Sequence, residues 1–522
     1  MTRGSASAAT IGCVLRRCGL SARLALPAAI GAAALLLRLY GLGDKPFWLD
    51  EVASLHRATA SVPDLVADSL HASHYPSYFL LLWLVARIGA SQWLLRLPSA
   101  IFGALAAALA CATGRQVGGL RSGAVAGLLT AFSPFSVQLG QEARSYTLVS
   151  CLILLALWGV VRLVQDPAAA ALPPLRKGPA RAAWAAYVVG TAAALGVLNV
   201  AVSWLFAANL AVAAIAWRGG PGFAGLRRSW VLAQGLVLAA WAPMLAAVYA
   251  AAHGAILDAA GWAPAATGET IWSIVAPVYL MRIASVVTPD LAPVAVPGLS
   301  LAVAALAALG VWRLRRDAGV LWVLGCAALV PPLVLLLVSL LVPVLVARYI
   351  AWSAAPFYIL AGVGLGRMAL APFAALTPVL AAACLTNLMP YYNFEAKPRW
   401  DLLASELAAE ARPGDVVLLN SYYSYSVLAV FAARAGLANG GVALSWQLPQ
   451  AAALASGHDL WAVYGRAGQR ATQSQEDYRR SLDVLGMPVA EAAVGRYIRF
   501  WRFRQPLAPA KPNQHAQVDR RP

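Results

Sequence analysis

The stretch Phe47-Trp48-Leu49-Asp50-Glu51 follows the first long apolar segment, residues 24–42 (LALPAAIGAAALLLRLYGL). This segment is long enough to cross a bilayer, since a spanning helix needs about 20 apolar residues. Two adjacent carboxylates, Asp50 and Glu51, are therefore expected at a membrane boundary beside Trp48. Acids near a hydrocarbon core are costly, about 2.5–3.5 kcal/mol each at mid-depth, and typically mark a functional site. The alternative is that both lie in water beyond the helix end, and this stretch alone favours neither.

The composition is that of an integral membrane protein. Of the 522 residues, 61% are hydrophobic and only 12% are charged, whereas soluble domains carry about 25% charged residues. The net charge is +18, but much of the basic excess lies in short loops between apolar runs, as the positive-inside rule describes. We therefore expect no nucleic-acid partner, while membrane lipids and an anionic lipid substrate are expected partners.

Apolar runs long enough to span the membrane number about eleven. They are residues 24–42, 98–117, 123–139, 145–164, 183–199, 201–217, 230–250, 296–313, 319–345, 349–366 and 370–389. The shorter run 75–88 decides the topology. If it spans, the basic clusters at 115–121 and 162–181 fall outside; if it is an interfacial or re-entrant helix, every basic cluster falls inside. The positive-inside rule favours the second interpretation.

This topology predicts a multi-pass protein of the cell (inner) membrane with a cytoplasmic N-terminus. Residues 43–97, the turn near 140–146 and residues 251–295 then share the outer, periplasmic side with the C-terminus. From about residue 391 the composition becomes that of a soluble domain, in which short apolar runs alternate with helical stretches. Strands between helices predict a small α/β domain.

The predicted strands are residues 415–420, 459–464 and 497–503, and the predicted helices are 401–411 and 474–484. The fold class is thus an all-α polytopic membrane protein with interfacial helices and a small C-terminal α/β domain on the outer face. The predicted parts are a transmembrane domain, an outer α/β domain and a disordered tail: residues 1–390, 391–505 and 506–522.

Three further polar sites lie at predicted membrane boundaries on the outer side. Glu142 and Arg144 occur between two apolar runs, where an ion pair or a helix cap is the simpler interpretation. His74 opens the interfacial helix, and Arg348 ends a long apolar run, where an arginine can merely snorkel. Together with Asp50 these sites supply carboxylates, imidazole and guanidinium groups to one outward cavity.

Such a set of groups suits transfer from a phosphate-linked donor. A carboxylate can act as general base toward an acceptor hydroxyl or amine. Arginines can bind a phosphate bidentately and stabilise the charge that builds on it as it leaves. The aromatic side chains that accompany them suit the apolar faces of a sugar or a prenyl chain: Trp48, Tyr75, Tyr78 and Tyr146.

The order of the motifs resembles the protein mannosyltransferase superfamily of C-type membrane glycosyltransferases, which includes the aminoarabinose transferase of lipid A. The resemblance covers roughly residues 30–165, with Arg348-Tyr349 in addition, and where the family has His-Pro-Pro this chain has His74-Tyr75-Pro76. It rests on Phe47-Trp48-Leu49-Asp50-Glu51, His74-Tyr75-Pro76-Ser77-Tyr78, Leu95-Arg96-Leu97-Pro98-Ser99-Ala100-Ile101-Phe102-Gly103 and Gln141-Glu142-Ala143-Arg144-Ser145-Tyr146.

The resemblance implies a polyprenyl-phosphate-linked sugar donor, used on the outer face with inversion at the anomeric carbon. It implies that Asp50 is the base on the acceptor, with Glu51 as its neighbour in the catalytic motif. It also implies a donor-binding set lining the same cavity, in which Arg348 lies near the lipid phosphate. The members of this set are His74, Tyr78, Glu142, Arg144, Tyr146, Arg348 and Tyr349.

The sequence therefore predicts a glycosyltransferase that moves a hexosyl or pentosyl group from a polyprenyl phosphate to an envelope acceptor: lipid A, another glycan, or Ser/Thr of an exported protein. The alternatives are a flippase of a lipid-linked sugar and a non-catalytic scaffold. A flippase should show a polar path at mid-membrane and paired repeats with broken helices, whereas here charges gather at one face. The chain has no Asp-x-Asp motif, so a nucleotide sugar is not expected.

Three smaller expectations complete the prediction. No cofactor is obligatory; Asp50, Glu51 and Glu142 are compatible with a divalent cation, although hard-cation sites usually gather more oxygen ligands. The glycines at 362, 364 and 366 predict close helix packing. The tyrosines at 422, 423 and 425 are interpreted as part of a packed aromatic core, with sugar stacking as the alternative.

Overall fold

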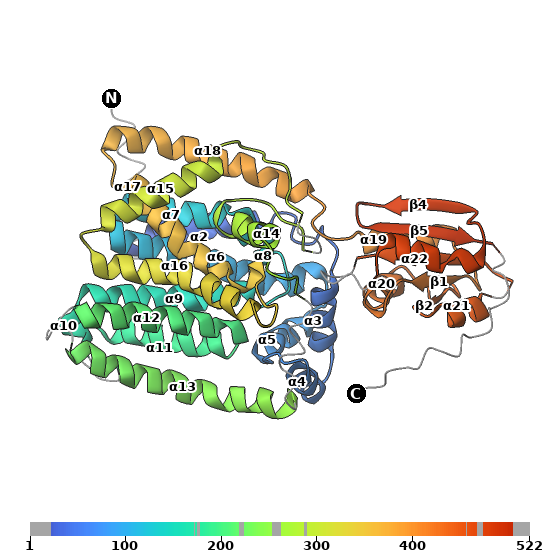
Figure 1. Cartoon of the computed structure of the whole chain (residues 1–522), viewed down its shortest axis with the longest axis horizontal. Helices are drawn as coiled ribbons and strands as arrows, with labels where there is room; N and C mark the ends of the chain where they lie inside the picture. The colour runs from blue at the N-terminus through green and yellow to red at the C-terminus, as the bar shows by residue number, and fades with distance from the viewer. Residues whose placement is uncertain are drawn as a thin grey trace. The chain divides into compact units, whose positions relative to one another are not determined.

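The computed structural model describes residues 22–171, 173–174, 178–218, 224–252, 263–286, 290–455, 457–466 and 473–504. The chain forms two compact units (Figure 1). The first is helical and ends at Phe394. The second contains the C-terminal residues from Glu395 onward together with Asp44–Ala53 and Ser285. The predicted disordered tail, residues 506–522, lies outside the described residues.

The described part of the helical unit consists mainly of helices, and each apolar run predicted to span falls on one or more of them. The helices are α2 (Ala22–Leu39), α4 (Val62–His71), α5 (Ser77–Ala86), α6 (Gln92–Gly118), α7 (Leu120–Phe132), α8 (Pro134–Gly140), α9 (Tyr146–Gln165), α10 (Pro167–Ala170), α11 (Arg181–Leu195), α12 (Val202–Arg218), α13 (Ala224–Ala252), α14 (Gly268–Tyr279), α15 (Leu299–Leu314), α16 (Ala318–Ser339), α17 (Ala354–Gly366) and α18 (Leu370–Asn393). Helix α3 (Leu49–Thr59) begins in the second unit and ends in the first.

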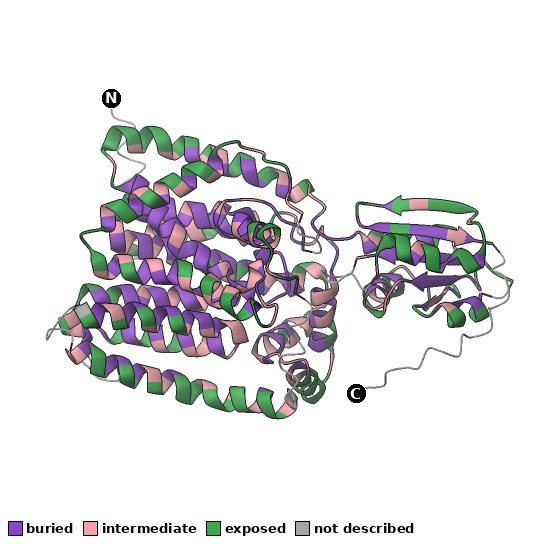
Figure 2. Cartoon of the chain, in the orientation of Figure 1, coloured by how far each residue is buried: buried purple, intermediate pink, exposed green. Residues whose placement is uncertain are grey.

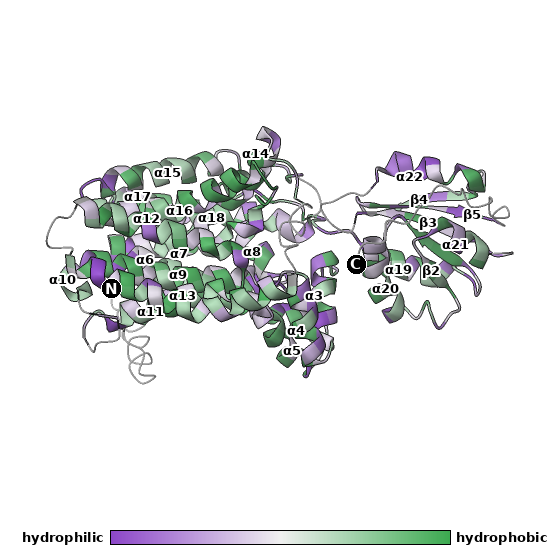
Figure 3. Cartoon of the chain, turned by 60° about the horizontal axis from the view of Figure 1, so that its bottom comes forward, coloured by the Kyte–Doolittle hydropathy of each residue, from purple (hydrophilic) through white to green (hydrophobic). Residues whose placement is uncertain are grey.

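Seven helices of the described residues are long and apolar enough to cross a membrane, or eight if the bent pair α7–α8 forms one span. Helices α13 and α18 are both apolar, yet few of their residues are buried within the protein (Figure 2). Their exposed faces suit lipid. Figure 3 shows the same contrast between units: the long helices of the first are hydrophobic, whereas α22 (Gln475–Ser481) of the second is hydrophilic. The chain is an integral membrane protein.

Helix α17 lies at the centre of this unit and its glycines set the helix spacing. A Cβ at Gly362 would come within 2.9 Å of the Ala126 nitrogen of α7, and one at Gly364 would overlap the Leu306 carbonyl oxygen of α15. The predicted close packing is confirmed, and its reason is that bare glycines let α17 contact the backbones of two neighbours at once.

Helices α4, α5, α8 and α14 gather at one end of the bundle (Figure 1). Helix α5 has 10 residues, or about 15 Å, which is too short to cross a core of about 30 Å. This length is consistent with the interfacial helix predicted for residues 75–88.

Three of the basic clusters are joined to one another through backbone carbonyls. Arg121 donates to the Met368 carbonyl at 3.1 Å, and Arg367 donates to the Val117 carbonyl at 2.8 Å. Arg313 donates to the Arg367 carbonyl. Clustering of these charges at one set of helix ends is what the positive-inside rule requires, while the side of the membrane on which they lie stays a prediction.

The second unit is an α/β domain with a mixed five-stranded sheet. Its elements are α19 (Trp400–Glu410), β1 (Val416–Leu419), α20 (Tyr422–Arg434), β2 (Ala443–Ser445), α21 (Leu448–Leu454), β3 (Leu460–Gly465), α22, β4 (Ala490–Val494) and β5 (Ile498–Phe503). The strand order is β2-β1-β3-β5-β4; β2, β1 and β3 are parallel, and β5 is antiparallel to both β3 and β4.

The three predicted strands and two predicted helices of this domain are confirmed. Strands β2 and β4 were not predicted, because β2 has three residues and β4 (Ala-Glu-Ala-Ala-Val) has only one of the aromatic and branched residues typical of strands. Strands β1 and β3 are buried along their whole length. Since successive side chains point to opposite faces, both faces of the sheet are covered.

The α17 glycines generate a stability prediction. We expect Gly364→Ala to lower the free energy of unfolding by about 1–3 kcal/mol, because the added methyl group meets backbone that cannot turn away. The matched control is Gly325→Ala on α16, where a Cβ meets nothing within 4 Å. Thermal unfolding of the purified protein, followed with a thiol-reactive dye that reaches buried Cys111 on unfolding, measures both. Equal melting temperatures for the two variants would contradict the packing argument.

Candidate active site

An aromatic ring on α5, Phe79, is the centre of a cluster of predicted site residues in the helical unit. The guanidinium carbons of Arg57 and Arg144 lie 4.7 and 5.8 Å from its centroid. The rings of His74 and Tyr78 lie edge-on to it, at centroid distances of 6.2 and 6.3 Å. Two cations over one ring are held by its negative face.

The cluster continues from Arg144 to the segment that follows α16. The Arg144 guanidinium also lies 5.8 Å from the ring of Tyr146, which is 6.4 Å from the ring of Tyr349. The Arg348 guanidinium lies 5.8 Å from that second tyrosine ring. We call this chain of contacts the Phe79 network. It brings together six of the predicted donor-binding residues: His74, Tyr78, Arg144, Tyr146, Arg348 and Tyr349.

The turn before α5 fixes the direction of His74. Ser73 has a φ of 57°, in the left-handed region, and its carbonyl accepts a hydrogen bond of 3.0 Å from Asn199. The Nδ1 of His74 lies 2.6 Å from the Ala72 carbonyl, so this nitrogen carries the proton and donates. Tyr75 takes the place of the family's proline, and its hydroxyl accepts from Trp241 at 3.0 Å.

Ser99 connects Tyr78 to the loop that carries Arg144. Its hydroxyl donates to the Arg144 carbonyl at 3.0 Å and lies 2.7 Å from the Tyr78 hydroxyl. Because Ser99 has a single proton to donate, Tyr78 is the donor of the second bond. The 95–103 motif therefore has a structural role here. Its Arg96 likewise donates to the Leu42 carbonyl at 2.9 Å.

The loop of Glu142 and Arg144 exists because the helical path breaks before it. Helices α7 and α8 meet at a bend of 61°, where Ser133 caps α8 and Pro134 occupies its first turn. Both charged side chains are buried, with exposures of 1% and 8%. The N-cap of α9 is Ser145, whose side chain makes no capping hydrogen bond, and the first turn of α9 contains no acidic residue. The ion-pair and helix-cap interpretations of Glu142 and Arg144 stay predictions.

Arg38 on α2 supports this break and was not singled out by the sequence analysis. Its side chain is fully buried. The guanidinium donates to the carbonyls of Ala34 and Ala131, at 2.8 and 3.4 Å, and to the Ser136 hydroxyl at 2.8 Å. It thus binds the end of α7 and the start of α8 together. A lone arginine inside an apolar run was the signal available for finding it.

Gln141 completes the connection between α2 and the loop. Its amide nitrogen donates to the carbonyls of Arg38 and Tyr40, at 3.0 and 2.7 Å, and its amide oxygen accepts from the Tyr391 hydroxyl at 2.9 Å. The last carbonyls of a helix have no partner within it. Gln141 supplies one and thereby fixes where the loop begins.

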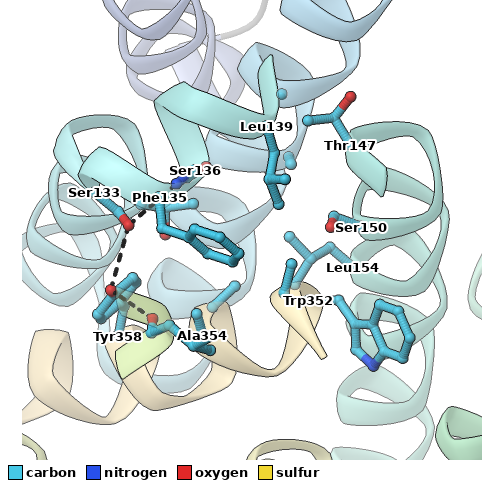
Figure 4. Close-up of a pocket in the computed structure, with 16 residues that line it drawn as sticks. Ser133, Phe135, Ser136, Leu139, Thr147, Ser150, Leu154, Trp352, Ala354 and Tyr358 are labelled. Carbon is cyan, nitrogen blue, oxygen red and sulfur yellow. Dashed lines mark hydrogen bonds between the residues drawn. The ribbon is translucent and has the colours of Figure 1, made fainter. Parts of the chain in front are cut away.

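The helical unit contains a small cavity of about 30 Å³, lined by Ser133, Thr147, Ser150, Trp352 and Tyr358 among others (Figure 4). Ligand pockets are typically about 300–1,000 Å³, so this cavity is too small for a sugar. Part of its hydroxyl-lined wall comes from the helix break, where the Tyr358 hydroxyl lies 3.5 Å from that of Ser133 and donates to the Val278 carbonyl at 3.0 Å.

The remaining two predicted residues, Asp50 and Glu51, belong to the second unit. Asp50 is partly exposed in the first turn of α3. Glu51 is fully buried, and its Oε2 accepts a hydrogen bond of 2.7 Å from the ammonium of Lys397, which is 3% exposed. This ion pair fixes Glu51, and the sequence analysis did not identify its lysine.

Aromatic contacts hold the rest of the motif in the same unit. Trp48 packs with Val286 and Tyr497 in a buried cluster. Phe47 is fully buried, and the Arg434 guanidinium lies 5.6 Å from its centroid. The segment 44–53 is therefore part of the α/β unit by its contacts, although it is distant in sequence.

Residue Glu395 anchors the segment between α18 and α19 that carries Lys397. Its carboxylate accepts two hydrogen bonds, of 2.9 and 3.0 Å, from the Arg496 backbone N–H at the β4–β5 turn. Burial raises the pKa of Glu395 above its ordinary value, since desolvation of the carboxylate outweighs the stabilising N–H donor. The neighbouring Ala396 carbonyl accepts a hydrogen bond of 3.1 Å from the Val286 N–H.

The sequence left open a divalent cation bound by Asp50, Glu51 and Glu142. Within the described residues, no three His, Cys, Asp or Glu side chains come together in a way that could hold a metal ion. Glu142 belongs to the first unit, and Asp50 and Glu51 belong to the second.

Comparison with known proteins gives structural matches only. No protein-family model matches the sequence, and no curated protein matches it significantly. ArnT from Cupriavidus metallidurans in the apo state is 14% identical over 92% of this chain and 98% of that chain, with a TM-score of 0.58. The same protein bound to undecaprenyl phosphate is 13% identical over 93% and 99%, also with a TM-score of 0.58.

A more distant structure shares part of the architecture. The archaeal oligosaccharyltransferase AglB from Archaeoglobus fulgidus, in complex with an inhibitory peptide and a dolichol-phosphate, is 11% identical over 85% of this chain and 69% of that chain, with a TM-score of 0.51. The chain has the fold of the C-type membrane glycosyltransferases. This confirms the resemblance stated from the motifs at the level of the fold.

Arg38 generates a prediction about the helix break. We expect Arg38→Met to lower the free energy of unfolding by about 1–3 kcal/mol, because it leaves the Ala131 carbonyl and the Ser136 hydroxyl buried without their donor. The control is Arg316→Met, an exposed arginine between α15 and α16. Thermal unfolding of both variants provides the comparison. An unchanged melting temperature for Arg38→Met would mean that the break does not depend on the guanidinium.

Lys397 generates a prediction about the ion pair. Lys397→Met should destabilise the protein by about 3–5 kcal/mol, because the buried Glu51 carboxylate loses its counter-charge. Adding Glu51→Gln should restore much of that loss, since the double variant buries no charge. Limited proteolysis and thermal unfolding report both variants. A double variant as unstable as Lys397→Met alone would show that packing, and not charge, is what the lysine provides.

Proposed function

We propose that this protein is an inverting membrane glycosyltransferase that takes its sugar from a polyprenyl phosphate. The observation that carries the proposal is the Phe79 network, which gathers Arg144 and Arg348 with aromatic rings at one end of a bundle with the ArnT fold. Two matched structures add support, since one contains undecaprenyl phosphate and the other a dolichol-phosphate.

In this proposal the helical unit binds the donor. Arg144 and Arg348 hold the phosphate, because guanidinium groups bind phosphate oxygens in pairs and remain charged. The tyrosine rings of the network and Phe79 offer apolar surface to the first isoprene units or to the sugar. Buried Glu142 offsets part of the positive charge of the empty site.

Asp50 is proposed as the general base. The acceptor hydroxyl attacks the anomeric carbon and gives its proton to the Asp50 carboxylate as the new C–O bond forms. The bond between that carbon and the phosphate oxygen breaks, and the polyprenyl phosphate leaves with the electron pair. Its developing charge is stabilised by the arginines. One displacement at the anomeric carbon inverts its configuration.

Glu51 is proposed as a positioning residue. Its ion pair with Lys397 fixes the first turn of α3, so that the neighbouring carboxylate of Asp50 stays partly exposed and available to an acceptor. We further propose that the reaction takes place on the outer face of the inner membrane, with lipid A, another envelope glycan, or Ser/Thr of an exported protein as the acceptor.

A transfer assay tests the proposal. Purified protein in lipid nanodiscs receives radiolabelled polyprenyl-phosphate sugars, hexosyl and pentosyl, with a mixture of envelope lipids and exported peptides. We expect Asp50→Asn to lower the rate of transfer by about 10²–10⁴-fold, the usual contribution of a general base, with no change in donor binding. Asp44→Asn, an exposed acid of the same loop, is the control and should be neutral.

The same assay also tests the proposed donor site. Arg348→Gln should raise the KM for the donor more than it lowers kcat. Normal transfer by Asp50→Asn would overturn the base assignment. Absence of transfer with every donor, together with movement of labelled donor across reconstituted vesicles, would support the flippase instead.

A further inference from the structure

The α/β domain exposes a group of aromatic side chains at one edge of its sheet. Tyr422, Tyr423 and Trp446 are 57%, 46% and 39% exposed, and Tyr425 is partly buried behind them. The Tyr422 ring stacks on that of Tyr425 with an interplanar angle of 22° and a centroid distance of 6.2 Å. The Trp446 ring lies 4.7 Å from Tyr425 and 5.2 Å from Tyr422. We call these four residues the aromatic platform.

The platform corrects one interpretation of the sequence. The three tyrosines were expected in a packed aromatic core, yet the core of this domain is made by other residues, among them Trp501 and Tyr478. The tyrosines of α20 pack on one another and on Trp446, with their outer faces in solvent. Adjacent exposed aromatic residues of this size typically mark a binding surface.

The position of the platform in the sheet is the second observation. Tyr422 begins α20, separated from the end of β1 by two residues, and Trp446 follows directly after the end of β2. These strands are parallel, so their carboxyl ends lie at the same edge. The chain leaves β1 toward β2 and then returns across β1 to β3, so the topological switch point lies between β1 and β3. It borders the β1 end after which α20 begins with Tyr422, whereas Trp446 lies one strand away, at the end of β2. Open α/β sheets bind ligands at the carboxyl ends of strands at such a point.

The framework beneath the rings is held by hydrogen bonds. Asn420, between β1 and α20, accepts from the Gly465 N–H at 3.1 Å and from the Ser424 hydroxyl at 2.9 Å. Ser421 caps α20 by accepting from the Ser424 N–H at 3.2 Å. Beside Trp446, the Ser445 hydroxyl accepts from the Gln447 N–H at 3.2 Å. A surface fixed in this way loses little entropy when a ligand binds.

The chemistry of the platform selects a neutral ligand. The segments 420–428 and 443–454 contain no charged residue, so neither a phosphate nor an acidic polymer finds a counter-charge on them. They do contain tyrosine hydroxyls, amides and serines beside the rings. Aromatic faces bind the C–H faces of a pyranose, while neutral donors and acceptors bind its hydroxyls. An anionic membrane surface would instead require lysine or arginine among the rings.

We propose that the aromatic platform binds uncharged pyranose units of a glycan. If the proposed function holds, that glycan is the acceptor of the transfer, and this assignment to the acceptor rests on the proposed function. The binding itself does not, because the platform lies on the α/β domain and uses none of the residues proposed for catalysis.

The test measures saccharide binding to the full-length protein in nanodiscs, without glucoside detergents. The probes are neutral gluco-, manno- and chito-oligosaccharides of six units, followed by saturation-transfer NMR and calorimetry. We expect at least one to bind, and Trp446→Ala or Tyr422→Ala to weaken its binding about tenfold, the effect of losing one aromatic contact. Met487→Ala, an 86% exposed residue of the same domain, is the control and should bind as the wild type.

Three outcomes would contradict the proposal that the platform binds saccharides. They are no binding of any probe, equal binding by the wild type and both aromatic variants, and quenching of Trp446 fluorescence by brominated lipids. The last is measured as wild type minus Trp446→Phe and would place the rings in the bilayer. Asp50→Asn should bind saccharide as the wild type does. Binding without transfer would overturn the proposed function alone, and transfer without binding would overturn the platform alone.

Discussion

A break in the helical path inside an apolar bundle is the constraint on which the candidate donor site depends. Where α7 ends and α8 begins, backbone groups lose their helical partners, and lipid cannot replace them. The buried guanidinium of Arg38 binds both sides of the break, and Gln141 ties the following loop to the end of α2. The loop that carries Glu142 and Arg144 therefore has a fixed origin in a region where irregular backbone is otherwise too costly.

A second buried charge organises the other unit. The Glu51 carboxylate pairs with Lys397, and the surrounding contacts of Phe47 and Trp48 hold the same loop against the α/β domain. An acid would be costly in this position without its counter-charge. The residue proposed as base, Asp50, is thereby left as the partly exposed member of an adjacent pair whose other member is fully buried.

The fold survives great divergence of sequence, as the 14% identity with ArnT over nearly its whole length shows. Apolar side chains of similar volume are interchangeable in a helix bundle, so most positions are free to vary. A substitution costs more where a polar group has one geometry that satisfies it or where two backbones touch. Arg38, Ser99 and Gly364 are examples in this chain.

The sequence by itself determined what depends on neighbours along the chain. The apolar runs and their lengths predicted the helices. The alternation of short apolar runs with helical stretches predicted three strands of the α/β domain, and the motifs indicated the fold. It also gave Asp50, Glu142 and Arg144 as candidates, because charges are rare beside long apolar runs. Strand β4 was missed because its alanines and glutamate have no strand preference of their own, and it is stable only as the partner of β5.

Only the tertiary structure decided which groups satisfy the buried charges and which faces are exposed. Lys397 lies 346 residues from Glu51, and Tyr391 lies 250 residues from Gln141. The sequence predicted that the tyrosines of α20 belong to the core of the domain, but two of them are exposed. Other residues pack against the sheet and form its core instead. Hydrophobic periodicity is a local property, whereas the partner of a buried polar group is chosen by the folded chain as a whole.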